Sequence, residues 1–218
     1  MTVSTQTVLI IDDHPLFRKG ANQLLGMDAH FEILGEAASG AEGIKLAVEL
    51  TPDLILLDLD MKGMNGIQTL TKLREEDIDS LIIVLTVSNA EDDLLAALRS
   101  GADGYLLKDM EPEEILLKLK RAGKGQIIMD DTMANMLALA LREEKRTVVP
   151  NEVPFTGREE EILRLIAEGL SNKLIGRELG ISDGTVKVHV KNLLRKLNLN
   201  SRLEAAVWAL ANNFGKQP

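Results

Sequence analysis

The stretch DLILLDLD (residues 53–60) places four consecutive aliphatic residues directly before Asp58. Short apolar runs of this kind are typical of strands that are buried on both faces of a parallel sheet. Three other runs also end at a polar or charged residue, and a fifth ends at Gly35 without such a group. These runs are 8–11 before Asp12 and Asp13, 81–85 before Thr86, 105–107 before Lys108, and 31–34.

Segments with helical length and amphipathic spacing separate these runs. They cover residues 16–27, 41–50, 67–75, 91–99 and 113–122. Strand and helix therefore alternate five times, which predicts an α/β doubly wound, five-stranded parallel sheet with helices on both faces. Ligands of such folds bind beyond the carboxyl ends of the strands, where the strand order reverses. The polar residues that follow the strands are expected to meet there.

Three carboxylates at one sheet edge repel one another unless a cation neutralises them, and oxygen ligands suit Mg²⁺. We expect Asp13 and Asp58 to be direct ligands and Asp12 to assist through water. An aspartate beside a divalent cation can attack phosphorus and form an acyl phosphate. Asp58 is the predicted nucleophile, and Thr86 and Lys108 are expected to contact the phosphoryl oxygens.

Each of these residues also has a purely structural explanation. An aspartate after a strand is often a turn or cap residue, and a threonine on a strand reflects strand propensity. Tyr105, the only tyrosine, is either a packing residue or a ring that changes position when Thr86 engages phosphate. Four groups placed together at strand ends favour a phosphate-handling site over separate caps.

Composition restricts the remaining possibilities. The chain has no cysteine, which excludes disulfides and thiolate metal sites. No apolar run approaches the roughly 18 residues needed to cross a membrane, and the N-terminus MTVSTQT shows no secretory signal. The expectation is a soluble, cytoplasmic protein.

Charge divides the chain into two parts. Residues from Phe155 onward carry ten Lys and Arg against seven Asp and Glu, a net +3, whereas the rest carries fifteen against twenty-seven, a net −12. Residues 142–154 have mixed charge, two prolines and no periodicity, which is typical of a linker, and 130–141 read as a helix. The predicted units are residues 6–124, a helix and linker at 125–154, and a second domain at 155–215.

The second domain reads as four short helices. In the third, Val186, Val190, Leu193 and Leu197 follow a core-facing spacing, and basic residues recur every four positions at Lys187, Lys191 and Arg195. Like charges at that spacing cost about 0.2–0.5 kcal/mol per pair in an isolated helix. A solvated basic face is one explanation. Contact with DNA phosphates and bases is the other, and the helix–turn–helix order favours it. Val188 is expected to be exposed beside the lysines.

The quoted motifs LIIDDHP (9–15), DLILLDLDMKGMNG (53–66), IIVLTVS (82–88) and GADGYLLKD (101–109) resemble the receiver domain of two-component response regulators, which is CheY-like and flavodoxin-like. The resemblance implies that a sensor histidine kinase phosphorylates Asp58, and that Asp12, Asp13, Asp58 and the backbone carbonyl of Asp60 hold Mg²⁺. It also implies switch roles for Thr86 and Tyr105 and a phosphoryl contact for Lys108. Many receivers have proline where this chain has Lys62 and Asp109, which leaves the isomer of the Lys108–Asp109 peptide open.

The segment from Glu159 to Ala206 resembles the LuxR-type helix-turn-helix domain. By this resemblance the scaffold helix is about 172–179 and the recognition helix about 183–197, with Lys187, Val188, Lys191 and Arg195 toward DNA. Gly176 stands where alanine is usual. Receiver and LuxR-type domain together are the NarL/FixJ architecture, and residues 87–114 and 185–208 resemble its nitrate and nitrite regulators. The implied function is phosphorylation-dependent transcriptional control of anaerobic respiratory genes, without enzymatic turnover.

The resemblance implies further partners and a mode of control. Promoter DNA, a second copy of the chain bound on DNA, and RNA polymerase are the expected partners. Surplus apolar residues on the last helix, Leu203, Val207 and Leu210, suggest the dimer surface. We expect the unphosphorylated receiver to cover the recognition helix and phosphorylation to release it.

The sequence is also compatible with two other functions. Asp58 and Asp60 also resemble the paired aspartates of haloacid dehalogenase phosphatases, although that motif normally lies on the first strand of the core. Alternatively, a receiver could act only through protein partners, with the C-terminal helices as a docking bundle. The basic stripe on the third helix counts against that second alternative.

Overall fold

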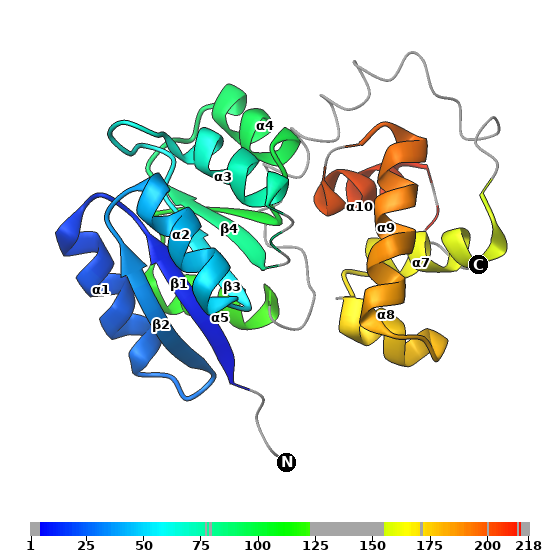
Figure 1. The fold of residues 1–218 in the computed structure, drawn as a ribbon, viewed down its shortest axis with the longest axis horizontal. Helices are drawn as coiled ribbons and strands as arrows, with labels where there is room; N and C mark the ends of the chain where they lie inside the picture. The colour runs from blue at the N-terminus through cyan, green and yellow to red at the C-terminus, as the bar shows by residue number, and fades with distance from the viewer. Residues whose placement is uncertain are drawn as a thin grey trace.

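The computed structural model describes residues 5–76, 78, 80–122, 155–170, 172–199, 201–212 and 214. The predicted helix at 130–141 and the linker at 142–154 lie outside the described residues. Within them the chain forms an α/β domain followed by a helical domain (Figure 1).

The first domain is a parallel sheet in the order β2-β1-β3-β4-β5, which is the flavodoxin-like order. Its strands are β1 (Gln6–Ile11), β2 (Phe31–Ala37), β3 (Leu54–Leu57), β4 (Leu81–Thr86) and β5 (Gly104–Leu107). The order reverses between β1 and β3, so Asp12 and Asp58 follow neighbouring strands. The predicted doubly wound sheet is confirmed.

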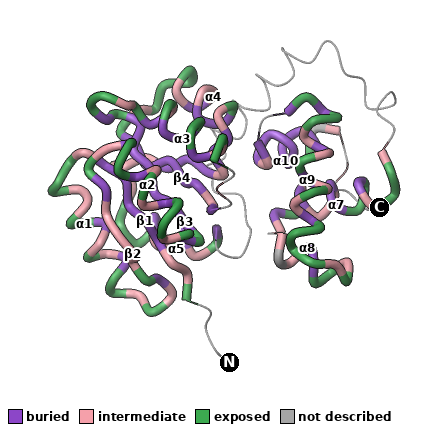
Figure 2. Tube along the Cα trace, in the orientation of Figure 1, coloured by how far each residue is buried: buried purple, intermediate pink, exposed green. Residues whose placement is uncertain are grey.

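Alternating side chains give the sheet two apolar layers. Val8 and Ile10 of β1 pack with α1 and α5, whereas Leu9 and Ile11 pack with α2, α3 and α4. Both faces are therefore buried, as Figure 2 shows for the central strands, and this explains the uninterrupted apolar runs. The helices are α1 (Pro15–Gly26), α2 (Gly40–Leu50), α3 (Gly66–Glu75), α4 (Glu91–Arg99) and α5 (Pro112–Ala122).

Strand β2 is longer than the sequence predicts. It continues past Gly35 to Ala37, and its register against β1 shifts between Val8 and Leu9. Because glycine has no side chain, Gly35 allows the side chains of Leu9 and Leu50 to approach closely. The glycine therefore lies within the strand and does not end it.

The second domain contains α7 (Gly157–Ala167), α8 (Asn172–Leu179), α9 (Asp183–Leu197) and α10 (Arg202–Ala211). Ser182 and Ser201 cap α9 and α10, and each side chain accepts a hydrogen bond from the backbone N–H three residues further on. Ile162, Ile175, Leu193 and Trp208 lie in one core. Gly176 has a packing role, because an added Cβ would lie 2.6 Å from the carbonyl oxygen of Ile181.

The N-terminus of α7 is held by a buried carboxylate that the sequence analysis did not identify. Glu159 Oε2 accepts hydrogen bonds from Thr156 N at 2.8 Å, Thr156 Oγ1 at 3.0 Å and Lys196 Nζ at 2.7 Å. Burial raises the pKa of Glu159, but the bonds to Lys196 and Thr156 outweigh it and leave the pKa below its ordinary value. A carboxylate with a lowered pKa stabilises the fold above the unfolded pKa and loses that contribution as pH falls.

Glu159→Gln is expected to lower the free energy of unfolding of the second domain by about 1–2 kcal/mol at neutral pH, because charged hydrogen bonds are lost. The difference from wild type should shrink as pH falls below about 4.5, the ordinary pKa, since both side chains are then neutral. Urea unfolding followed by circular dichroism at several pH values measures both effects. Glu160→Gln, one residue along and exposed, is the matched control. A pH-independent loss would show that the charge of Glu159 does not stabilise the fold.

The two domains meet through α10. Leu203 and Val207 of α10 belong to the same buried cluster as Leu94, Ala97 and Leu98 of α4. Arg202, at the start of α10, is anchored within the second domain, where its guanidinium donates to Asn172 Oδ1 at 2.8 Å and to the Leu170 carbonyl. Burial lowers the pKa of Arg202 to about 10, and Asp103 of the first domain opposes that shift. Figure 1 shows α10 on the side of the second domain that faces the first.

Candidate functional site

The predicted acidic residues converge at the carboxyl edge of the sheet. Asp12 and Asp58 are each 2% exposed, and Asp13 is partly exposed beside them. The Asp58 N–H donates to the Ile11 carbonyl at 2.9 Å, which joins the ends of β1 and β3 and fixes the spacing of their aspartates. Asp60 lies at the same edge and is exposed.

Lys108 connects two of these carboxylates. Its Nζ lies 2.7 Å from Asp12 Oδ2 and 2.9 Å from Asp58 Oδ2, and 4.4 Å from the centre of the Phe17 ring. Asp58 Oδ1 is buried and has no hydrogen-bond partner among the described residues. Burial raises the pKa of Asp58, and the contacts with Lys108 only partly offset this rise. A bound cation would also offset the cost of burying the Asp58 charge.

The residue types and their placement fit a divalent cation. Carboxylates of Asp12, Asp13 and Asp58 offer hard oxygen ligands within 4.8 Å of one another, and two of them have buried oxygens that lack hydrogen bonds within the described part of the chain. His14 belongs to the same cluster, with its Nδ1 3.0 Å from Asp13 Oδ1. His14 was not among the predicted site residues, although its position directly after the aspartate pair is a signal in the sequence.

A close glycine shapes the loop beyond Asp58. A Cβ on Gly66 would lie 2.2 Å from the Asp58 carbonyl oxygen and 2.5 Å from Leu59 Cα. The first turn of α3 therefore packs directly on the backbone that carries Asp58, and only glycine permits this approach.

Thr86 is the last residue of β4, and Tyr105 is the second residue of the adjacent strand β5. Thr86 Oγ1 accepts a hydrogen bond from Ser88 N at 3.3 Å, and the Tyr105 hydroxyl donates to the Ser88 carbonyl at 2.9 Å. Burial raises the pKa of Tyr105 to about 12, with Asp93 adding to the shift, so the phenol is neutral at physiological pH. Both residues thus contact the loop that leads into α4. No peptide bond of the described residues is cis, the Lys108–Asp109 bond included.

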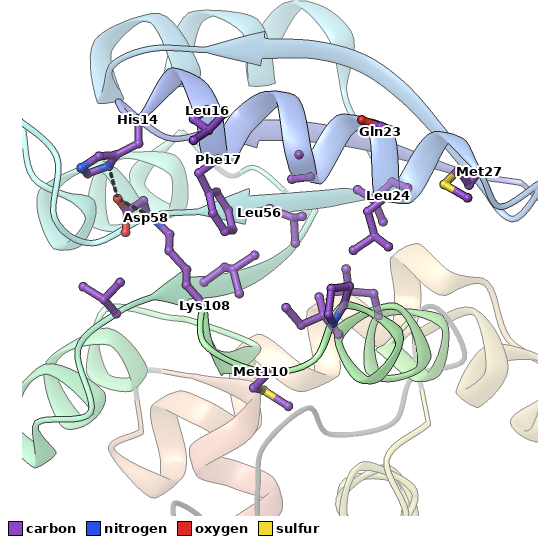
Figure 3. Close-up of a pocket in the computed structure, with 18 of the residues that line it drawn as sticks. His14, Leu16, Phe17, Gln23, Leu24, Met27, Leu56, Asp58, Lys108 and Met110 are labelled. Atoms are coloured by element: carbon purple, nitrogen blue, oxygen red, sulfur yellow. Dashed lines mark ion pairs between the residues drawn. The ribbon is translucent and has the colours of Figure 1, made fainter.

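An apolar groove of about 760 Å³ runs from the acidic cluster between α1 and α5. Phe17, Leu24 and Met110 lie along it, and Asp58 and Lys108 stand at one end (Figure 3). Leu16 of α1 and Met27, the residue that follows α1, are 86% and 80% exposed. Both side chains also line the groove, so they extend one apolar surface, and a contiguous exposed apolar surface marks a contact with another molecule.

The third helix of the second domain presents the predicted basic face. Val186, Val190, Leu193 and Leu197 of α9 are buried, whereas Lys191 and Arg195 are exposed and Lys187 is half-buried. Val188 is 59% exposed beside them, as predicted. Helix α8, the three residues 180–182 and α9 form a helix-turn-helix.

The expectation that the first domain covers this face is wrong for the structure described. Val188, Lys191 and Arg195 remain exposed. The covered surface is instead that of Leu203 and Val207 on α10, which the sequence suggested as a dimer surface. Leu210, the third residue of that set, is 53% exposed.

Comparison with known proteins assigns each of the two domains to a family. Residues 8–120 match the response regulator receiver domain, and residues 153–209 match the bacterial regulatory proteins of the luxR family. The chain is 52% identical over 202 residues to the nitrate/nitrite response regulator protein NarL of Escherichia coli K12, covering 93% of this chain and 94% of that protein. It is 46% identical over 206 residues to NarP of the same strain, with the same coverage.

A solved structure extends the similarity to the whole chain. The response regulator ChrA of a heme-sensing two-component system is 29% identical, with a TM-score of 0.51, and the match covers 97% of this chain and 99% of that one. Within the described residues, no helix has the length and apolarity needed to cross a membrane. A receiver joined to a LuxR-type domain implies a kinase as phosphate donor and promoter DNA as target. The chain therefore belongs to the two-component response regulators of the NarL/FixJ family.

Proposed function

We propose that the protein is a phosphorylation-gated transcription factor in which Asp58 accepts phosphate from a sensor histidine kinase. The observation that carries this proposal is the buried Asp58 carboxylate between an acidic cluster and Lys108. Its Oδ1 has no hydrogen-bond partner among the described residues, and its Oδ2 lies 2.9 Å from Lys108 Nζ. A carboxylate in this setting can act as a nucleophile once its charge is balanced.

In the proposed reaction an Asp58 oxygen bonds to phosphorus as the bond between phosphorus and the kinase histidine breaks. Mg²⁺ is the proposed cofactor, and when bound it neutralises charge on the transferred group. Asp12, Asp13, Asp58 and the backbone carbonyl of Asp60 would hold it. Lys108 then exchanges a carboxylate contact for a phosphoryl oxygen, and the Thr86 hydroxyl donates to another.

The apolar groove along α1 is the proposed contact surface for the kinase. It opens beside Asp58, and a phosphohistidine must reach that residue for transfer to occur. Leu16 and Met27 would supply apolar area for this contact.

The proposed switch runs from Thr86 to α4. Thr86 and Tyr105 both contact Ser88, which precedes α4, and α4 packs on α10. If the Thr86 side chain turns toward the phosphoryl group to donate to it, its hydroxyl moves away from Ser88 N, and the loss of that contact would favour another position of the loop. We propose that this change releases Leu203 and Val207 of α10 for pairing with a second copy on DNA.

DNA recognition is assigned to α9. The proposed contacts are Lys187, Val188, Lys191 and Arg195, with the lysines reaching base acceptors or phosphates and Val188 meeting a thymine methyl.

The proposed domain limits are 6–124, 125–154 and 155–215. By similarity to NarL and NarP, we propose a nitrate or nitrite signal, control of anaerobic respiratory genes, contact with RNA polymerase and a cytoplasmic location.

The alternatives fit less well. Asp58 follows β3, whereas the haloacid dehalogenase motif follows the first core strand, and both family matches favour a regulator. We propose that the protein forms an acyl phosphate without turning over free phosphate esters. A purely protein-docking role for the second domain leaves the exposed basic face of α9 without an explanation.

The deciding experiment compares DNA binding by the full-length protein with and without beryllium fluoride and Mg²⁺, which together mimic the phosphoryl group. The DNA carries two paired half-sites. Binding that tightens at least about tenfold with the mimic supports gating; that factor is a coupling of about 1.4 kcal/mol. Equal binding in both states would leave DNA recognition intact and refute the switch.

A further inference from the structure

His14 is oriented toward the acidic cluster and has no role in the reaction proposed above. It occupies the N-cap position of α1, but its side chain makes no capping hydrogen bond. Its ring turns instead toward the carboxylates, with Nδ1 3.2 Å from Asp12 Oδ1, 3.0 Å from Asp13 Oδ1 and 3.6 Å from Asp58 Oδ2. Figure 3 shows the ring beside Asp58.

Comparison with His30 shows which contacts of His14 arise from the local turn and which do not. His30 follows Asp28 as His14 follows Asp12, and each histidine places its backbone N–H and its Nδ1 near the aspartate Oδ1 two residues earlier. The contact with Asp12 is therefore a local feature of an Asp-X-His turn. The approach to Asp13 and Asp58 is specific to His14.

The spacing of these atoms fits a shared ion. Adjacent ligands of an octahedral ion with bonds of about 2.1 Å lie about 3.0 Å apart. The distance from His14 Nδ1 to Asp13 Oδ1 is 3.0 Å, and one ligand atom from each of Asp12, Asp13, His14 and Asp58 falls within 4.8 Å of the others. We propose that His14 Nδ1 is a direct ligand when a first-row transition-metal ion occupies this site. The proposal rests on the divalent-cation site of the proposed function.

An independent observation also indicates an ion. The Asp58 side chain is 1% exposed, and its Oδ1 lacks a hydrogen-bond partner within the described residues. A buried carboxylate oxygen without a partner carries a desolvation cost that a bound cation removes. The His14 side chain is 62% exposed, so its ring can adjust to the ion while Asp58 stays fixed.

A nitrogen ligand changes which ions the site prefers. Mg²⁺ favours oxygen ligands, whereas imidazole suits Co²⁺, Ni²⁺ and Zn²⁺, whose affinities exceed that of Mn²⁺ at mixed sites. With His14 the site should bind Co²⁺ more tightly than an all-oxygen site would. Without His14 the three carboxylates should bind Mg²⁺ nearly as well as before. His14 is thus proposed to set metal selectivity at the phosphorylation site.

The test measures binding of Co²⁺ and Mg²⁺ separately to the full-length protein by isothermal titration calorimetry, with no phosphate donor. His14→Ala is expected to weaken Co²⁺ binding by about tenfold or more and Mg²⁺ binding by less than about twofold. His30→Ala is the matched control and should change neither affinity. Because Mg²⁺ binding is measured on the same variant, it also reports whether the acidic cluster is intact.

Visible absorption of bound Co²⁺ provides a second readout. Its d–d bands should differ between wild type and His14→Ala, because replacing nitrogen by water changes the ligand field. Equal losses of Co²⁺ and Mg²⁺ affinity in His14→Ala, or unchanged Co²⁺ affinity and bands, would overturn the assignment of His14 while leaving the Mg²⁺ site in place. Failure of the wild type to bind either ion would instead refute the cation site of the proposed function, and the role of His14 with it.

Discussion

Replacing Asp58 with asparagine is expected to abolish phosphate incorporation from a phosphodonor such as acetyl phosphate. An amide oxygen is a far weaker nucleophile than a carboxylate. Among the described residues, Asp12 is the one other carboxylate that is as buried as Asp58 and also contacts Lys108. Asp12 is held by Lys108, by the His14 N–H and by the His14 ring. Phosphorylation of Asp58→Asn should therefore fall below detection. It can be measured as the slower migration of phosphorylated protein in a gel that binds phosphate, and as the added mass of the intact protein.

The same variant should lose the gain in DNA affinity but keep the affinity of the unphosphorylated protein. Asp92→Asn, an exposed carboxylate on α4, is the control and should be phosphorylated like wild type. If Asp58→Asn still incorporated one phosphate per chain, the acceptor would be another residue and the proposed reaction would be wrong.

Replacing Lys191 with alanine is expected to weaken binding of the phosphorylated protein to its DNA site by about 1–3 kcal/mol, which corresponds to a factor of about 5 to 160. Lys191 is exposed on the face of α9 opposite its buried residues, where a groove-bound helix would meet bases or phosphates. If the contact is to phosphate, the slope of log affinity against log salt should also fall by about one. Fluorescence anisotropy with labelled DNA at several salt concentrations measures both quantities.

Lys45→Ala on α2 is a suitable control for net charge, because Lys45 is also exposed but lies on the first domain. Its affinity for DNA and its salt slope should stay close to those of wild type. An equal effect of the two substitutions would mean that overall charge, and not a contact made by α9, determines DNA affinity.

Much of the fold could be predicted because the apolar runs have unambiguous periods. The bounds of β3 and α4 agree with the ranges predicted from these periods, and those of α8 and α9 agree with the ranges implied by the resemblance to the LuxR-type domain. Asp12, Asp13, Asp58 and Lys108 meet at the predicted sheet edge. The meeting of these residues can be predicted without knowing the strand order, because every parallel strand of a sheet ends at the same edge.

Other features depend on information that periodicity does not carry. The sequence shows that Leu203 and Val207 are surplus to the core of a small domain, but the surface that covers them is a matter of tertiary packing. Whether His14 caps α1 or turns toward the aspartates depends on the orientation of its side chain. In the sequence Glu159 is one of three consecutive glutamates, and nothing near it indicates the ion pair with Lys196, which lies 37 residues away along the chain.

Placement of the only tryptophan of the chain gives the protein an optical reporter of its own. Trp208 lies on α10, 2% exposed, with the rings of Phe155 and Phe214 at 6.1 and 5.5 Å, and its neighbour Val207 packs against the receiver. Excitation at a wavelength that indole absorbs and phenol does not selects Trp208 over Tyr105. Emission from the native, unlabelled protein therefore comes from the helix on which the two domains meet, so separation of the domains can be followed in real time without a dye.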